Sequence, residues 1–308
     1  MRKRRKFYRG VVNHVYQRTI DGVQLFYTIE DCLVFYTIFS VCAKNAEIQV
    51  LMLCLMHNHI HVLVKTESVQ ELSGFMDKFS SWFVHEYNKN VGRKGKLLKK
   101  NFGSAPKWDN KKLRSAIIYI GNNPVEKGFC RKAGEARWNF MAYRTDQYPF
   151  SQKISRPNAS YNMRRTLEEI DAMVRLNLPL KYAQIDRIFK KLVDSEKEQM
   201  IDYIISSYLP FDYDELESQF KSFDSMLYAM ESTTGDDYDI NESRDNFSLK
   251  VFEEMMSYME TKMPRNRIRT ITAYTLGEKM ALYKELQFYT SASSQQICSF
   301  LHIKTGEV

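Results

Sequence analysis

Two histidines separated by one residue, His59 and His61, are the side chains of this sequence best suited to hold a metal ion. Residues 59–65 have the apolar character of a β-strand, where residues i and i+2 point to the same face of the sheet. Both imidazoles therefore project together, while Ile60 packs on the opposite side. Each ring can give one nitrogen to a divalent cation, but a complete site also needs a third ligand and open positions for a substrate. From this spacing alone, two histidines on a hydrogen-bonded sheet face remain the simpler alternative.

A tyrosine and an asparagine one helical turn apart form a second pair that can do chemistry. Residues 109–123 have the apolar periodicity of a helix that begins after Asp109 and ends before Pro124. Tyr119 and Asn123 are spaced i, i+4 on it, so their side chains are neighbours. A phenolate can attack a phosphodiester and conserve the ester energy in a covalent phosphotyrosine. The asparagine carbonyl oxygen can ligate the same metal. The chain has 19 tyrosines, however, and spacing alone leaves a packing role open for Tyr119.

The elements that must position these pairs alternate between strands and helices. We expect strands at 8–18, 47–55 and 59–65, helices at 28–45, 69–90 and 109–123, and a loop at 91–102 that contains a short edge strand. This order predicts an α+β fold of ferredoxin-like type, an antiparallel sheet covered by helices. Residues 1–150 are expected to form this domain. Residues 151–308 are expected to form a mostly helical accessory region, in which residues 279–303 resemble part of a helix-turn-helix but a small helical bundle is the favoured interpretation.

Composition restricts the class of protein. Hydrophobic residues make up 44% of the 308 and charged residues 27%, which is typical of a globular chain of about two domains. No segment has the apolar length of a membrane span or of an export leader, so a cytoplasmic protein without a membrane partner is expected. The five cysteines are far apart and form no CxxC motif, which favours isolated thiols over disulfides or a zinc site.

The positive charge is concentrated in the first half. Residues 1–150 contain 25 Lys and Arg against 12 Asp and Glu, a net charge of +13, whereas the remainder carries −5. A basic domain attracts polyanions, of which nucleic acid is the commonest. Besides the basic segment 2–9, the candidates for phosphate contact are Arg18, Arg93, Lys94, Lys96, Lys99, Lys100, Lys111, Lys112 and Arg114. Phe102 and Trp108 flank this stretch, and core packing is expected for both in preference to stacking on bases.

Three segments together resemble a known family. Residues 56–64, with the order Met-His-Asn-His-Ile-His-Val-Leu-Val, resemble the histidine-hydrophobe-histidine signature of single-tyrosine HUH transposases. Residues 119–128 resemble the tyrosine motif of the REP-associated tyrosine transposase branch, and residues 14–18 are similar to the opening strand of that family. The spacing between the segments also fits. The resemblance covers residues 8–145, which is under half of the chain.

The resemblance implies an HUH endonuclease fold and a Mg²⁺ or Mn²⁺ ion. It implies that His59, His61 and Asn123 are metal ligands and that Tyr119 is the nucleophile. Members of the family cut single-stranded DNA, often near a hairpin, and leave a 5′-phosphotyrosine and a 3′-hydroxyl. Single-stranded or hairpin DNA is therefore the expected partner. Because members act as monomers or as dimers with shared sites, a homodimer stays open.

Two positions depart from the family pattern. His57 stands where the family usually has proline, and we expect an exposed histidine in a turn, or else a ring that approaches the metal or the phosphate. Asn101 precedes Phe102 where the family tends to have an arginine. These departures motivate the alternative of a catalytically inactive, domesticated DNA-binding protein of the same fold. An unrelated hydrolase that uses the histidines as ligands is a third hypothesis, but it leaves the basic first half unexplained.

Overall fold

The computed structural model describes residues 9–232 and 247–304, and its N-terminal part contains a four-stranded antiparallel sheet. The strand order is β2-β3-β1-β4, and all three neighbouring pairs are antiparallel. The ferredoxin-like arrangement expected from the sequence is therefore confirmed. In chain order, its elements are β1 (Val12–Arg18), α1 (Ile29–Asn45), β2 (Gln49–Met56), β3 (His59–Lys65), α2 (Val69–Val91), β4 (Gly103–Lys107) and α3 (Asn110–Glu126).

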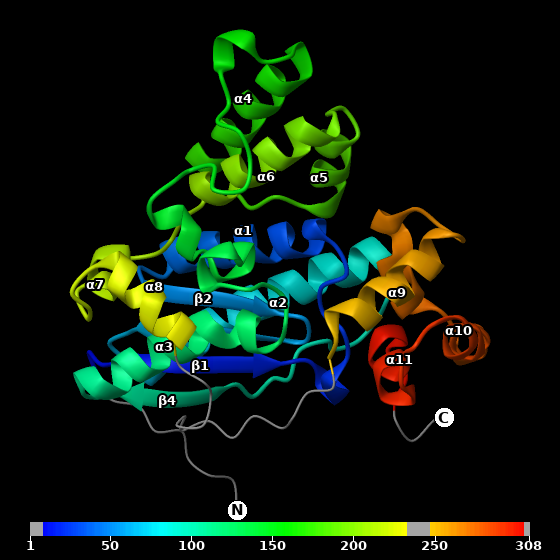
Figure 1. The fold of residues 1–308 in the computed structure, drawn as a ribbon, viewed down its shortest axis with the longest axis horizontal. Coiled ribbons are helices and arrows are strands. Elements are labelled where there is room, and N and C mark those ends of the chain that lie inside the picture. The colour runs from blue at the N-terminus through cyan, green and yellow to red at the C-terminus, as the bar shows by residue number, and fades with distance from the viewer. Residues whose placement is uncertain (1–8, 233–246, 305–308) are drawn as a thin grey trace, which may run out of the picture.

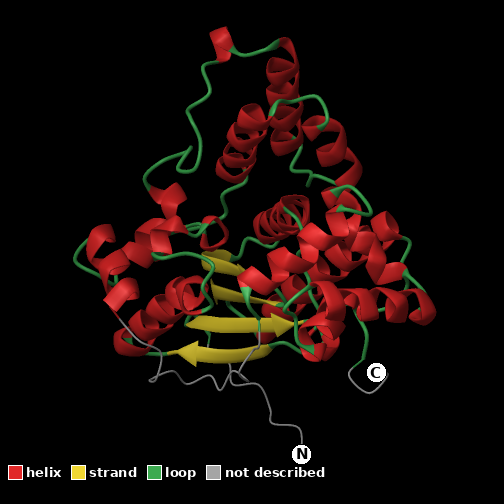
Figure 2. Ribbon diagram, turned by 45° about the vertical axis from the view of Figure 1, so that its right-hand side comes forward, coloured by secondary structure: helices red, strands yellow, loops and turns green. Residues whose placement is uncertain are grey.

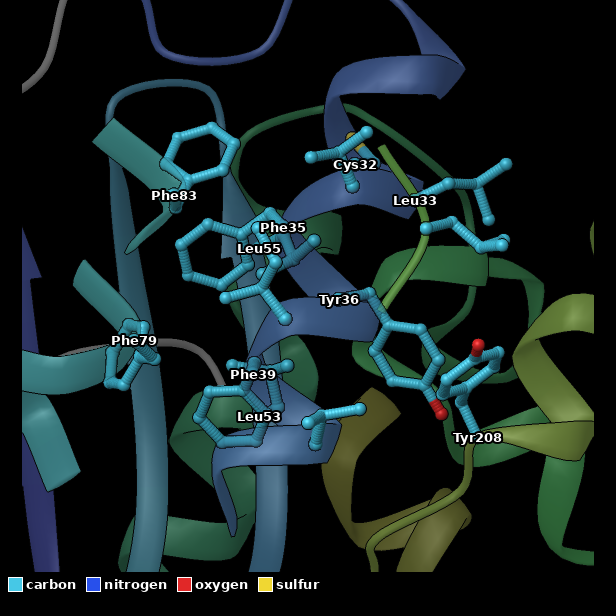
Figure 3. Close-up of a cluster of buried hydrophobic side chains, with 14 of the residues drawn as sticks. Cys32, Leu33, Phe35, Tyr36, Phe39, Leu53, Leu55, Phe79, Phe83 and Tyr208 are labelled. Atoms are coloured by element: carbon cyan, nitrogen blue, oxygen red, sulfur yellow. The ribbon is translucent and has the colours of Figure 1, made fainter. Parts of the chain in front are cut away.

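One face of the sheet is covered by α1 and α2 (Figure 1). Alternation sends one set of strand side chains to this face, and Ile60 of β3 packs there as expected. Aromatic rings of the two helices fill the layer between sheet and helices: Phe35 meets Phe83 edge to face, and Phe39 meets Phe79 in the same way (Figure 3). The expected capping box at Thr28 begins α1, with the Asp31 carboxylate accepting from the Thr28 backbone N–H. This packing makes the sheet a rigid base for the opposite face.

The opposite face is covered by α3, and α3 is covered in turn by α8 (Phe223–Ser232). Met226 and Met230 of α8 are fully buried against the apolar stripe of α3. The contact is close because Gly121 has no side chain. A Cβ at this position would lie 2.3 Å from Sδ of Met230, well inside van der Waals contact. The helix that carries Tyr119 is thus held between the sheet and α8.

The remaining helices form two groups around the domain (Figures 1 and 2). The first group stands above α1, and its apolar side chains belong to the same buried cluster as the sheet and α1. The second lies beside the start of α1 and the end of α2. The 3₁₀ helix Arg265–Ala273, between α9 and α10, places Arg269 in the buried contact between this group and the domain, here called the seam. The first group consists of α4 (Tyr161–Arg175), α5 (Tyr182–Phe189) and α6 (Asp194–Ser207). The second consists of α9 (Leu249–Glu260), α10 (Leu276–Tyr289) and α11 (Ser294–Leu301). The short helix α7 (Tyr213–Glu217) lies between the first group and α8 in the chain. Among the described residues, no helix is long and apolar enough to cross a bilayer.

Three local expectations need correction. The helix α3 does not end before Pro124 but runs through it to Glu126. Proline is tolerated because Pro124 lies in the last turn, so that only the Ile120 carbonyl loses its helical donor. The edge strand expected within 91–102 lies just after it, at Gly103–Lys107. Trp108 is 54% exposed rather than in the core, with the Lys112 ammonium 3.4 Å from its ring centre, whereas Phe102 is buried as expected.

Candidate metal and tyrosine site

The strand β3 places the two histidines side by side, as its alternation predicts. The Nε2 atoms of His59 and His61 are 3.1 Å apart, and both rings are buried. Two ligand atoms at about 2.1 Å from one cation and at right angles to each other are about 3.0 Å apart. The spacing of the two nitrogens therefore matches that of two ligands of a single ion.

Neighbouring side chains fix the orientation of both rings. Nδ1 of His59 is 2.6 Å from Oδ1 of Asn58, and Nδ1 of His61 is 2.9 Å from Nε2 of His14. When each Nδ1–H donates to its neighbour, each Nε2 presents a lone pair to the gap between the two rings. Two lone pairs that face each other repel unless a cation or a proton lies between them. Two Nε2 lone pairs that face one gap, each fixed by a hydrogen bond at Nδ1, are the arrangement that a metal site needs.

Sequence reasoning did not identify His14 and Asn58 as supports of the site. The β1–β3 register pairs Tyr16 with His61, and His14 lies on the same face, diagonally across from His61. His14 is fully buried on this face, and its ring lies 5.1 Å from that of His61. The alternation of β1 placed His14 on a definite face, but only the register of two strands distant in sequence places it against His61.

The helix α3 brings the tyrosine and the asparagine to the same place. The ring centre of Tyr119 lies 5.5 Å from that of His61 and 5.9 Å from that of His14. Nδ2 of Asn123 is 3.5 Å from Nε2 of His61, and the Asn123 side-chain oxygen is buried without a hydrogen-bond partner in the described part of the chain. A buried carbonyl oxygen without a donor is costly and is suited to receive a cation. The i, i+4 pair from α3 and the i, i+2 pair from β3 therefore converge.

The donor set fits a divalent cation. It consists of two imidazole nitrogens and one amide oxygen, a mixed set that leaves positions for water or a phosphate oxygen. In the described ranges, no group of three or more His, Cys, Asp and Glu side chains has metal-binding geometry, so no rival site built from those residue types is present there. Asn123 is the candidate third member because its side-chain amide reaches Nε2 of His61, with Nδ2 at 3.5 Å, and a half-turn of the amide exchanges this nitrogen with the buried oxygen.

His57 is not the exposed turn residue that the sequence favoured. It is only 6% exposed, and its ring stacks on that of Phe247, with ring centres 4.0 Å apart and planes 21° apart. Phe129 stacks on Phe247 in turn. The sequence could not predict this burial because Phe247 comes from a segment 190 residues later in the chain. The ring of His57 lies 6.2 Å from that of His59, beside the site rather than within it.

A comparison with protein families identifies the part of the chain that carries this site. The family described as "Transposase IS200 like" matches residues 11–122. Residues 11–122, which match this family model over about a third of the chain, are called the IS200-like domain below. The domain contains both histidines, His14 and Tyr119, while Asn123 lies one residue beyond the matched segment.

The IS200-like domain is also similar to a solved structure. That structure is a REP-associated tyrosine transposase bound to a REP hairpin, with 16% identity and a TM-score of 0.38. The match covers 45% of this chain and 81% of the other chain. No curated protein matches this sequence.

The basic residues of the IS200-like domain are distributed over three places. The first is the end of β1, where Arg18 pairs with His59 in the sheet register and its carbonyl accepts from the Lys99 backbone N–H. The second is the loop after α2, where Arg93 donates to the Asn88 side chain and to loop carbonyls and so braces the loop. The third is the first part of α3. In these places Lys94, Lys96, Lys99, Lys100 and Arg114 are exposed, and Lys112 is half-buried.

Removing the His14 imidazole is expected to weaken metal binding by this domain. The change His14→Ala takes away the acceptor of the His61 Nδ1–H, so His61 loses its fixed tautomer and orientation. We expect Mn²⁺ affinity, measured by titration calorimetry, to fall by about 10- to 100-fold. His14→Gln should recover part of this loss because its carbonyl oxygen can accept the same hydrogen bond.

The matched control is His85→Ala, since His85 lies exposed on α2. Its Mn²⁺ affinity should equal that of the wild type. The comparison includes only variants whose thermal stability matches that of the wild type. Unchanged Mn²⁺ affinity in a folded His14→Ala variant would contradict the supporting role of His14.

Proposed function

We propose that this protein is a metal-dependent, single-tyrosine DNA endonuclease and strand transferase of the transposase kind. Its substrate is single-stranded DNA that bears a hairpin, as the resemblance of residues 119–128 implies, and its cation is Mg²⁺ or Mn²⁺. The main support is the convergence of two Nε2 atoms 3.1 Å apart with the Tyr119 ring on a buried sheet face. His59, His61 and Asn123 hold the ion in this proposal, and Tyr119 is the nucleophile.

The chemistry assigned to Tyr119 is an in-line displacement at phosphorus. The phenolic oxygen forms a bond to the phosphorus, and the bond from that phosphorus to the 3′ oxygen of the preceding nucleotide breaks. The proton lost by the phenol is balanced by the proton gained by the departing 3′-hydroxyl. A bound divalent cation supplies Lewis-acid stabilisation of the charge that develops on the phosphate. The resulting 5′-phosphotyrosine retains the ester energy for joining to a second 3′-hydroxyl.

In this proposal the basic residues contact phosphates of the DNA strand on both sides of the bond that is cut. Arg18 and Lys99 lie where β1 ends, beside His59, and Lys112 and Arg114 lie on α3 before Tyr119. Contacts from such cations to phosphates position a strand without reading its sequence. Binding should therefore weaken steeply as salt is raised.

A covalent-adduct assay tests this function. The probe is a pool of fluorescent single-stranded oligonucleotides, each with a hairpin stem and randomised flanks. With Mn²⁺ the wild-type chain should give a denaturation-resistant protein–DNA band, and mass spectrometry should place the phosphate on Tyr119. EDTA should abolish the band. Mn²⁺ should support a faster reaction than Mg²⁺, because two imidazole ligands favour first-row transition ions.

The same assay decides between the proposed function and the alternative. Salt-sensitive binding of the pool with no adduct in Mn²⁺ or Mg²⁺ would overturn the nuclease and support a non-cleaving DNA-binding protein. An adduct that forms equally well in EDTA would overturn the metal dependence.

A further inference from the structure

A small polar cavity lies directly beside the candidate metal site. Its volume is about 270 Å³, and it is bounded by residues of β1, the turn after β2 and the helices α9 and α11. Asn58 connects the two sites: its side chain lines the cavity, and its Oδ1 is 2.6 Å from Nδ1 of His59. A group bound in the cavity is therefore separated from a candidate metal ligand by one side chain.

The two sides of the cavity have different origins and different chemistry. Arg18 and Lys99 of the IS200-like domain supply two cations, and among the described lining residues Asp21 is the one carboxylate. The accessory region supplies the other side, with the Gln295 amide from the first turn of α11 and apolar atoms from Phe252 and Phe300. Cations, an amide and an apolar surface are together the groups that bind the phosphate, the base edge and the base face of a nucleotide.

The cavity is held open by hydrogen bonds that cross the seam between its two sides. The backbone N–H of Gln24 donates to the Ser299 carbonyl at 3.0 Å, and the Ser299 hydroxyl donates to the Gly22 carbonyl at 3.0 Å. Nε2 of His302 donates to the Gln24 carbonyl at 2.7 Å. Burial lowers the pKa of His302 to about 3, so the ring stays neutral near pH 7. Because several main-chain groups fix α11 to the domain, the cavity is preorganised.

We infer that this cavity binds one unpaired nucleotide of the DNA strand next to the scissile phosphate, with Gln295 at the base and Arg18 and Lys99 at the phosphate. Its volume of about 270 Å³ is close to the lower limit of roughly 300 Å³ for small-molecule pockets, which restricts the occupant to a single nucleotide and excludes a duplex. The inference rests on the proposed function, and it gives the accessory region a part in substrate recognition. The amides of glutamine and asparagine read base edges, most often adenine.

An abasic scan tests the pocket through binding alone. The parent protein carries Tyr119→Phe, and each variant adds one further substitution to it. Binding to the tightest-binding oligonucleotide of the pool is measured in EDTA, so that no strand is cut. Replacing single nucleotides by abasic residues should reveal one position beside the cut where affinity falls about tenfold. Gln295→Ala should lower affinity for the intact oligonucleotide to a similar extent. Combined with the abasic residue at that position, it should cause little further loss.

The matched control is Gln287→Ala, an exposed glutamine on α10 outside the cavity. It should bind the intact oligonucleotide as tightly as the parent and show the full abasic effect. Additive losses from Gln295→Ala and every abasic position would overturn the pocket, whatever the adduct assay gives. Coupling at one position without any adduct from the wild type would instead overturn the proposed nuclease and leave the pocket as a DNA-binding site.

Discussion

Replacing Tyr119 by phenylalanine is expected to abolish the covalent protein–DNA adduct. The change removes the oxygen that forms the bond to phosphorus in the proposed reaction and keeps the ring, whose centre lies 5.5 Å from that of His61. Loss of a nucleophile commonly costs several orders of magnitude in rate, so we expect a fall of at least about 10⁴-fold in adduct formation. Affinity for the hairpin oligonucleotide should change less than about threefold, because the phosphate contacts come from other side chains.

Tyr16→Phe is the matched control for this experiment. Tyr16 lies on the same face of the sheet, opposite His61 in the β1–β3 register, and its ring covers Gly103. Its hydroxyl has no part in the proposed reaction, so the adduct should form at the wild-type rate. An adduct that persists in Tyr119→Phe and is lost in Tyr16→Phe would assign the nucleophile to Tyr16.

Replacing Arg269 by alanine is expected to destabilise the fold more than any surface change. Arg269 is 1% exposed, its Nε donates to the Asn90 side chain at 2.9 Å, and it lies 3.7 Å from the Asp31 carboxylate. Burial alone lowers the pKa of Arg269, but the charge of Asp31, together with the charges of the other acidic groups nearby, more than offsets this, so the guanidinium stays protonated. Removing it leaves a buried carboxylate without its cation, which costs about 3–5 kcal/mol in free energy of unfolding.

Urea unfolding followed by circular dichroism measures this cost. Arg267→Ala, two residues away and exposed, should change the free energy of unfolding by less than about 0.5 kcal/mol. The double change Asp31→Asn and Arg269→Met should cost clearly less than the sum of its single changes, because the two charges are removed together. A loss below about 1 kcal/mol in Arg269→Ala would show that the buried ion pair does not hold the seam.

Local periodicity predicted which side chains of the candidate site are neighbours, whereas the choice of Tyr119 among 19 tyrosines came from the resemblance of residues 119–128 to the family. Strand alternation put His59 and His61 on one face, and helical spacing put Tyr119 next to Asn123. Each pair lies within at most five residues of sequence. The order of strands and helices likewise predicted an antiparallel sheet covered by helices.

The supports of the site were not predictable because they depend on contacts between distant segments. His14 reaches His61 only through the register of β1 against β3, and His57 is buried by Phe247 from beyond α8. The helical spacing after residue 160 indicated helices correctly but carried no information on where they pack. The seam that holds Arg269 and the cavity beside Gln295 are consequences of that packing.

The close seating of Met230 on Gly121 has a mechanical consequence for the tyrosine. Tyr119 is only 6% exposed, so a DNA strand must displace groups around it to reach the phenol. If α3 shifts while α8 stays, Met230 loses its contacts and a void opens between the two helices, which costs free energy. We therefore expect the two helices to move together, so that a substitution in α8 changes how far the proposed nucleophile, more than 100 residues earlier in the chain, can reach.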